Sequence, residues 1–167
     1  MHECDVITNM QRIITDLAEL LISRQYTLSV AESCTGGYLS KLCTDLAGSS
    51  AWFERGFITY SNQAKIDMLC VPPATISQFG AVSQETVTAM AQGALANSVA
   101  DCTIAISGVA GPGGATPSNP VGSVWFGWAQ QDHGTVAKQQ FFGGDREAVR
   151  AQAVEFAIEQ LIELIKL

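Results

Sequence analysis

Ser33 is a candidate nucleophile, because a hydroxyl can attack a carbonyl carbon when a nearby base takes its proton. The sequence holds only two histidines, His2 near the terminus and His133 in a predicted turn, so Ser-His-Asp and Cys-His arrangements are not expected. Lys65 and Tyr60 remain as candidates for the base. A lysine can serve only where burial or a nearby cation brings its pKa close to the working pH, and Ser-Lys pairs of this kind are an established variant.

Small residues follow Ser33 and recur in a second, glycine-rich loop over 108–120. Glycines let the backbone approach a ligand closely, and the helix predicted after residue 37 favours a phosphate or a developing oxyanion at its start. Hydroxyls, one lysine, one arginine and glycine-lined loops are typical of a site for a phosphorylated substrate. The candidate substrate-binding residues are Thr35, Gly36, Gly37, Ser61, Ser107, Gly108, Ala110, Gly111, Gly113 and Arg146.

Each candidate also has a structural interpretation. Ser33 or Thr35 could cap the helix that follows, Lys65 could be a solvated helix residue, and Tyr60 could be a core aromatic. Cys34 is interpreted as a small buried residue, since no base is at hand to form its thiolate. The glycine-rich loop is not followed by the Lys-Ser/Thr pair of a Walker A motif, so hydrolysis of a nucleoside triphosphate is not expected.

The elements that must position these residues alternate between strand and helix. Apolar and β-branched runs predict strands, and three- and four-residue apolar spacing predicts helices. The strands are expected at 26–32, 56–61, 102–107, 121–130 and 135–142, and the helices at 6–23, 36–46, 62–69, 84–99 and 147–167. A short helical turn is expected at 49–53, with Gly48 before it as the cap of the second helix.

The interleaved elements predict an α/β fold, a three-layer α/β/α sandwich with a mixed, mostly parallel sheet. Both faces of the strand at 121–130 are apolar, so helices should cover both sides of the sheet. Ligands of open α/β sheets bind beyond the carboxyl ends of the strands, and the candidate residues follow the predicted strand ends.

The composition describes one globular domain over residues 1–167 and restricts its partners. A hydrophobic fraction of 47% in 167 residues suffices for a single core. The net charge of −7, with no basic run, argues against nucleic-acid and membrane partners. The five cysteines contain no Cys-x-x-Cys pair, so neither a zinc site nor a disulfide framework is indicated. Free thiols, no signal pattern and no membrane-length apolar run favour a cytoplasmic protein.

Taken together, six segments resemble the CinA C-terminal domain family, which includes stand-alone nicotinamide-nucleotide amidases. They are AESCTGG (31–37), GSSAWFERGFITYSNQAK (48–65), GAVS (80–83), SGVAGPGG (107–114), PVGSVW (120–125) and GDRE (144–147). They follow the family order over nearly the whole chain. The additional N-terminal domain of full-length CinA proteins has no counterpart among them, so we expect none of its chemistry here.

The resemblance implies hydrolysis of the carboxamide of nicotinamide mononucleotide, giving nicotinate mononucleotide and ammonia, without a metal or other cofactor. It also implies a role in pyridine-nucleotide (NAD) salvage and a homo-oligomer, expected to be a dimer. Two alternatives stay open at this point. One is a non-catalytic nucleotide-binding or protein-interaction module of the same fold, and the other is a hydrolase for another amide or phosphorylated pyridine.

The resemblance further implies a division of roles. Ser33 would be the nucleophile and Lys65 its base, while Tyr60 would relay or orient the proton. Thr35 and the backbone of the two glycines after it would stabilise the oxyanion or position the substrate. The loop at 108–114 and Arg146 would hold the 5′-phosphate and ribose.

Overall fold

The computed structural model describes the backbone of residues 3–167 and the side chains of residues 9–167, so His2 lies outside the described residues. Its sheet has five strands in the order β2-β1-β3-β4-β5. The strands are β1 (Leu28–Glu32), β2 (Phe53–Ile58), β3 (Cys102–Gly108), β4 (Ser123–Gln130) and β5 (Gly134–Phe141). β1 pairs in parallel with β2 and β3, whereas β4 is antiparallel to both of its neighbours. The sheet is therefore mixed, as predicted.

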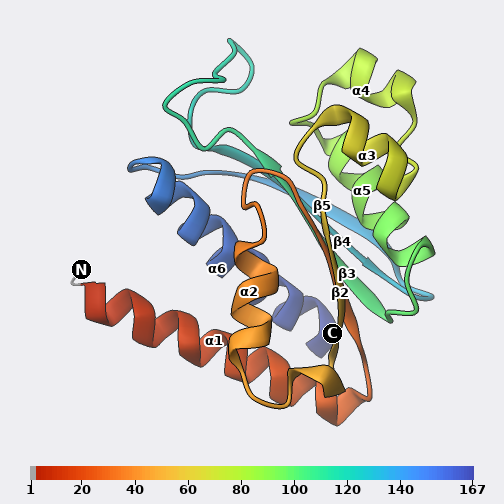
Figure 1. The fold of residues 1–167 in the computed structure, drawn as a ribbon, viewed down its shortest axis with the longest axis vertical. Helices are drawn as coiled ribbons and strands as arrows, with labels where there is room; N and C mark the ends of the chain where they lie inside the picture. Colours follow the sequence, from red (N-terminus) through yellow and green to blue (C-terminus); the bar gives the residue numbers. More distant parts are fainter. Residues whose placement is uncertain (1–2) are drawn as a thin grey trace.

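Helices cover both faces of this sheet and make the three predicted layers (Figure 1). One face carries α1 (Glu3–Arg24), α2 (Tyr38–Asp45) and α6 (Arg146–Lys166). The other face carries α3 (Asn62–Leu69), α4 (Pro73–Phe79) and α5 (Gln84–Ala96). A short 3-10 helix, η1 (Ser49–Ala51), leads into β2.

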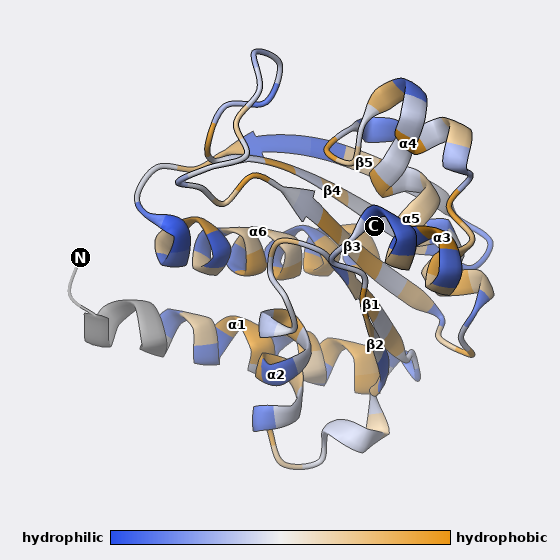
Figure 2. Ribbon diagram, turned by 45° about the horizontal axis from the view of Figure 1, so that its top comes forward, coloured by the Kyte–Doolittle hydropathy of each residue, from blue (hydrophilic) through white to orange (hydrophobic). Residues whose placement is uncertain are grey.

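An apolar cluster fills the space on each side of the sheet. The helix α6 buries one stripe, made of Val154, Ile158, Leu161 and Ile165, and its opposite side is hydrophilic (Figure 2). In β4, Phe126 and Trp128 stack at 5.7 Å between ring centroids on the α1/α6 side. Ala129 and Trp125 belong to the cluster under α5. Both faces of β4 are thus covered, because its side chains alternate between two apolar layers.

The structure differs from the expected elements at three points. The sequence patterns predict no helix between 69 and 84, where the pair Pro72-Pro73 is typical of a helix stop. A proline at the first helical position loses no hydrogen bond, and Pro73 begins α4. The strand β2 begins at Phe53, three residues before the predicted start at 56. Gly48 adopts a left-handed conformation with φ of +82°, but it directly precedes η1, and α2 ends at Asp45 with Leu46 as its cap.

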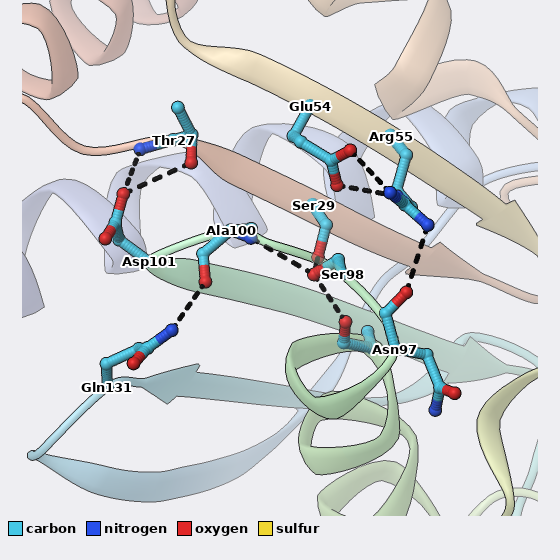
Figure 3. A network of polar contacts seen from close by, with 10 residues as sticks. Thr27, Ser29, Glu54, Arg55, Asn97, Ser98, Ala100, Asp101 and Gln131 are labelled. Carbon is cyan, nitrogen blue, oxygen red and sulfur yellow. Dashed lines mark hydrogen bonds and ion pairs between the residues drawn. The ribbon is translucent and has the colours of Figure 1, made fainter.

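Polar contacts fix the sheet at the amino ends of its parallel strands (Figure 3). The backbone N–H and hydroxyl of Thr27 donate to Asp101 Oδ2 at 2.8 and 3.1 Å, which ties the start of β1 to the start of β3. The Arg55 guanidinium contacts Glu54 and donates to the carbonyl of Asn97 at 3.1 Å, which links β2 to the end of α5. The candidate site lies at the opposite end of these strands, at their carboxyl ends. None of the described helices is long and apolar enough to span a bilayer.

Candidate active site

The carboxyl ends of β1, β2 and β3 open onto a cavity of about 280 Å³. The start of α6 closes one side of it, and the loop between β3 and β4 closes another. None of the side chains that line it is acidic. The lining residues, all within the described part of the chain, are Ser33, Cys34, Tyr60, Asn62, Lys65, Ala81, Val82, Ser107, Gly108, Val109, Ala110, Gly111, Gly113, Gly114 and Arg146.

Ser33 and Lys65 meet at the buried end of this cavity. Ser33 comes directly after β1, and its N–H donates to the carbonyl of Ile106 in β3, which fixes its backbone at the sheet edge. Ser61 caps α3 by accepting from the N–H of Ala64, so Lys65 lies on the first turn. The Lys65 Nζ lies 3.0 Å from the Ser33 Oγ, and the lysine is only 1% exposed. The solvated interpretation of Lys65 is therefore wrong.

Backbone carbonyls surround the rest of the Lys65 amine. Its Nζ donates to the carbonyls of Thr59 at 2.8 Å and Tyr60 at 3.3 Å, and the carbonyl of Ser61 lies at 3.5 Å. No carboxylate pairs with Lys65 among the described residues. Burial lowers the pKa of Lys65 from 10.5 to about 8, and the neighbouring Cys34 opposes this shift only in part.

Cys34 lines the same cavity without being a nucleophile. Burial raises the pKa of its thiol to about 11, so the thiol stays protonated at neutral pH. Its side chain is buried, which confirms the interpretation of Cys34 as a small buried residue.

Tyr60 and Arg146 form the outer rim of the cavity. Tyr60 is 61% exposed, so its interpretation as a core aromatic is wrong. The Arg146 guanidinium donates to the Tyr60 Oη at 3.3 Å and to the carbonyl of Gly111 at 2.9 Å. The Tyr60 phenol thus contacts Arg146, whereas it is the Tyr60 carbonyl that accepts from both the Ser33 hydroxyl and Lys65. This geometry gives the phenol no hydrogen bond on the proton path expected for it.

The end of β3 and the β3–β4 loop supply much of the remaining wall, and five of the predicted binding residues line the cavity there: Ser107, Gly108, Ala110, Gly111 and Gly113. The Ser107 hydroxyl donates to the carbonyl of Ala81 at 2.7 Å, which holds the segment before α5 against β3. A Cβ at Gly108 would lie 2.8 Å from the carbonyl oxygen of Ser123. The close approach of β4 therefore requires glycine at this strand end.

The start of α2 is not free to bind an anion, contrary to the expectation from the sequence. The buried Glu32 carboxylate accepts from the N–H groups of Leu39 and Ser40 at 2.9 and 3.0 Å and from the Ser40 hydroxyl at 2.7 Å. Neither Ser33 nor Thr35 caps this helix. A carboxylate of the protein occupies the position at which helix N-termini bind phosphate.

Four predicted binding residues do not line the cavity: Thr35, Gly36, Gly37 and Ser61. Thr35 is fully buried, and its hydroxyl has no hydrogen-bond partner among the described residues. The two glycines have φ of +57° and +101°, so they serve the sharp turn between β1 and α2. Ser61 is the cap of α3.

Two residues that sequence reasoning missed hold the loop that carries Ser33. Glu32 ties its beginning to α2, and Arg150 of α6 donates to the carbonyls of Cys34 at 3.1 Å and Thr35 at 2.9 Å. Arg150 is 116 residues from Cys34 in the sequence, so no local pattern points to it. The segment at 81–82, which also lines the cavity, lies in the GAVS motif and could have been found there.

The chain has close relatives over nearly its full length. The family model described as CinA C-terminal domain matches residues 10–165. The nicotinamide-nucleotide amidohydrolase PncC of Escherichia coli K12 is 46% identical over 154 residues, which cover 92% of this chain and 93% of the relative. PncC of Pseudomonas putida is 47% identical over 152 residues, covering 91% and 94%.

Solved structures agree with the sequence comparison. The crystal structure of competence damage-inducible protein A (ComA) from Klebsiella pneumoniae superposes with a TM-score of 0.91 at 38% identity, and the match covers 94% of this chain and 97% of that chain. The competence/damage inducible protein CihA from Agrobacterium tumefaciens gives the same TM-score of 0.91 at 38% identity, over 93% of this chain and 95% of that chain. The chain therefore belongs to the CinA C-terminal domain family.

Proposed function

We propose that this protein is an amidase that hydrolyses the carboxamide of nicotinamide mononucleotide to nicotinate mononucleotide and ammonia. The observation that carries the proposal is the 3.0 Å contact between the Lys65 amine and the Ser33 hydroxyl at the buried end of a cavity. The choice of substrate is supported by relatives named nicotinamide-nucleotide amidohydrolases, which match more than 90% of this chain and of their own length.

In the acylation half of the proposed reaction, the Ser33 Oγ attacks the carboxamide carbon while its proton passes to the neutral amine of Lys65. The tetrahedral intermediate then collapses as the C–N bond breaks. The ammonium of Lys65 returns the proton to the departing nitrogen, so that ammonia leaves and an ester on Ser33 remains. One amine, 3.0 Å from the attacking oxygen, acts as both base and acid.

In the deacylation half, a water molecule attacks the ester carbon and gives a proton to Lys65. The ester bond breaks, Ser33 regains a proton from Lys65, and nicotinate mononucleotide is released. The carbonyls of Thr59 and Tyr60 orient the amine in both states. A neutral amine can donate its two hydrogens to these carbonyls and direct its lone pair at Ser33, and an ammonium can donate its third hydrogen there.

The outer half of the cavity is proposed to bind the nucleotide. The proposed donors for the 5′-phosphate and ribose are Arg146 and N–H groups of the loop at 108–114, apart from that of Val109, which donates to the carbonyl of Ser123. Binding energy from this remote part of the substrate would position the carboxamide at Ser33. The Tyr60 ring, exposed at the rim, provides an apolar face beside them.

The proposal extends to the biological setting. We place the reaction in pyridine-nucleotide salvage, in the cytoplasm, by a homodimer. The four cysteines in the described part of the chain are free thiols, which supports a reducing compartment.

The direct test compares Ser33→Ala and Lys65→Ala with the unmodified protein. Ammonia release from nicotinamide mononucleotide is expected to fall by ~10³-fold or more in each variant, because nucleophile and base act as a unit. Circular dichroism should show both variants folded. Lys41→Ala is the matched control, since Lys41 is an exposed lysine on α2 whose one ion pair among the described side chains is with Asp45.

Two outcomes would contradict the proposal. Unchanged turnover in either site variant removes the Ser-Lys mechanism. Binding of the mononucleotide by calorimetry, with no ammonia released over hours by the unmodified protein, indicates the non-catalytic binding module instead.

A further inference from the structure

Arg150 reaches from the second turn of α6 to the loop directly after Ser33. Its Nε donates to the carbonyl of Cys34 at 3.1 Å, and its Nη2 donates to the carbonyl of Thr35 at 2.9 Å. We propose that Arg150 is a positioning residue that fixes the peptide groups after Ser33 so that the N–H of Cys34 stabilises the oxyanion. This inference rests on the proposed function.

Three successive carbonyls of this loop are held in place. The carbonyl of Ser33 accepts from the N–H of Gly36 at 3.1 Å. Those of Cys34 and Thr35 accept from Arg150, and that of Thr35 also accepts from the N–H of Tyr38. Because a trans peptide is planar, with its N–H opposite its C=O, holding these carbonyls fixes the direction of the N–H groups that follow them.

Of those N–H groups, that of Gly36 donates to the Ser33 carbonyl, and those of Cys34 and Thr35 have no acceptor in another residue among those described. Cys34 lines the cavity, whereas Thr35 does not. The N–H of Cys34 lies opposite the carbonyl of Ser33, and the N–H of Thr35 lies opposite the carbonyl of Cys34. Thr35 is fully buried, and its hydroxyl is also without a partner. Buried N–H groups are rarely left unpaired, and the Cys34 N–H belongs to the peptide directly after the nucleophile in a residue that lines the cavity, which indicates a donor to the developing oxyanion.

The guanidinium contributes more than geometry. Its hydrogen bonds to the Cys34 and Thr35 carbonyls are charge-assisted, and they polarise the peptide groups they reach. The Thr35 carbonyl shares a peptide with the Gly36 N–H, which donates to the Ser33 carbonyl, and the Ser33 carbonyl shares a peptide with the Cys34 N–H. Arg150 therefore strengthens the Cys34 N–H as a donor through one intervening hydrogen bond, because hydrogen bonds in a chain reinforce one another. Without Arg150, the N–H groups would remain but would be weaker and less well aimed.

A competing role for Arg150 is direct contact with the substrate phosphate. Arg150, Arg146 and Tyr38 share a second hollow of about 400 Å³ on the outer side of Arg146. The two roles predict different kinetics. A phosphate contact that is lost raises KM, whereas an oxyanion site that is disordered lowers kcat and leaves KM unchanged.

The test compares Arg150→Ala and Arg150→Lys with Gln152→Ala. Gln152 is a matched control on the same helix, since its side chain also donates to two backbone carbonyls, those of Gly143 and Ala148, and does not line the cavity. For Arg150→Ala we expect kcat to fall ~10- to 100-fold, with KM and the pH midpoint of activity unchanged. Arg150→Lys can donate to one carbonyl only, so its kcat should lie between that of the unmodified protein and that of Arg150→Ala. Millimolar guanidinium should partly restore the kcat of Arg150→Ala.

A second readout separates this inference from the choice of substrate. The rate at which a fluorophosphonate labels Ser33 also depends on stabilising a developing oxyanion, and it needs no nucleotide. If the unmodified protein is labelled quickly and Arg150→Ala slowly, the positioning role stands even where no ammonia is released from the mononucleotide. Equal labelling rates overturn it, and so does a raised KM with kcat unchanged. If Arg150→Ala does not fold, the labelling rate of Arg150→Lys decides.

Discussion

Lys65 is a cationic side chain that the fold buries without a carboxylate among the described residues to neutralise it. Backbone carbonyls and the Ser33 hydroxyl surround its amine, and burial lowers the pKa of Lys65 from 10.5 to about 8. Below that pH the amine carries a proton and has no lone pair for Ser33. The arrangement therefore links the proposed activity to the protonation state of one residue.

The pH dependence of the proposed activity follows from the fact that Lys65 acts as a base only after it has lost its proton. We expect kcat/KM to rise with pH and to reach half its plateau near pH 8, because deprotonation of Lys65 in the free enzyme creates the base. Rates of ammonia release at constant ionic strength between pH 6 and 10 would measure it. Activity independent of pH over this range would exclude Lys65 as the base, and a rise that shows no plateau by pH 10 would show that burial does not lower its pKa.

At the scale of elements, the position of Lys65 depends on how α3 packs against α5. Gly93 in α5 lies against the last residue of α3: a Cβ there would be 2.0 Å from the carbonyl oxygen of Leu69. This contact involves backbone on the α3 side, so it cannot be relieved by a rotamer change. The close approach of the two helices requires the glycine.

Gly93→Ala is therefore expected to destabilise the protein by about 1–3 kcal/mol, although alanine normally favours a helix by ~1 kcal/mol over glycine. It should also reduce activity, since α3 carries Lys65. Urea unfolding followed by circular dichroism measures the change. Gly143→Ala, where a Cβ meets nothing within 4 Å, is the control and should stay within ~0.5 kcal/mol of the unmodified protein. A Gly93→Ala variant as stable as the control would refute this account of the α3–α5 contact.

The sequence allowed most of these elements to be predicted, because strand and helix patterns differ in period. It could not give α4, since a proline pair fits both a helix stop and a helix start. It also could not give the partner of the α2 N-terminus. Glu32 lies in β1, and only the folded turn brings its carboxylate to the N–H groups of Leu39 and Ser40.

The candidate site was predictable only in part, because some of its residues follow from strand patterns and topology, whereas others come together only through contacts between distant segments. Residues at or directly after the carboxyl ends of strands, such as Ser107 in β3 and Ser33 after β1, are brought to one edge by the topology of any parallel sheet. The pairing of Ser33 with Lys65 came from the resemblance to a family, whose motifs carry long-range information. Arg150 comes from the interior of a helix, where an arginine is ordinarily a surface residue, and its role becomes visible only through its contacts.

For the whole molecule, the two apolar clusters share one sheet. Val30 and Ile104 pack on the α1/α6 side, while their neighbours Ala31 and Ala105 pack on the α5 side. Neither layer can unfold without exposing the strands that support the other. We therefore propose that the chain is a single cooperative domain.

A single domain predicts coincident unfolding transitions. Tryptophans report both layers, since Trp52 and Trp128 are in one cluster and Trp125 packs against the other. Urea titrations followed by tryptophan fluorescence and by far-ultraviolet circular dichroism should give the same midpoint. Two separate midpoints would show that the layers unfold independently.

The charges that face the cavity have the opposite sign from the molecule as a whole. Lys65 and Arg146 line it with no acidic side chain beside them, yet the net charge of the chain is −7. An anionic nucleotide is repelled at long range and attracted only once it is close. Dissolved salt screens interactions beyond about 10 Å at 0.1 M and shorter ones much less. Moderate ionic strength should consequently quicken the encounter with substrate, the reverse of what an enzyme with a positive surface would experience.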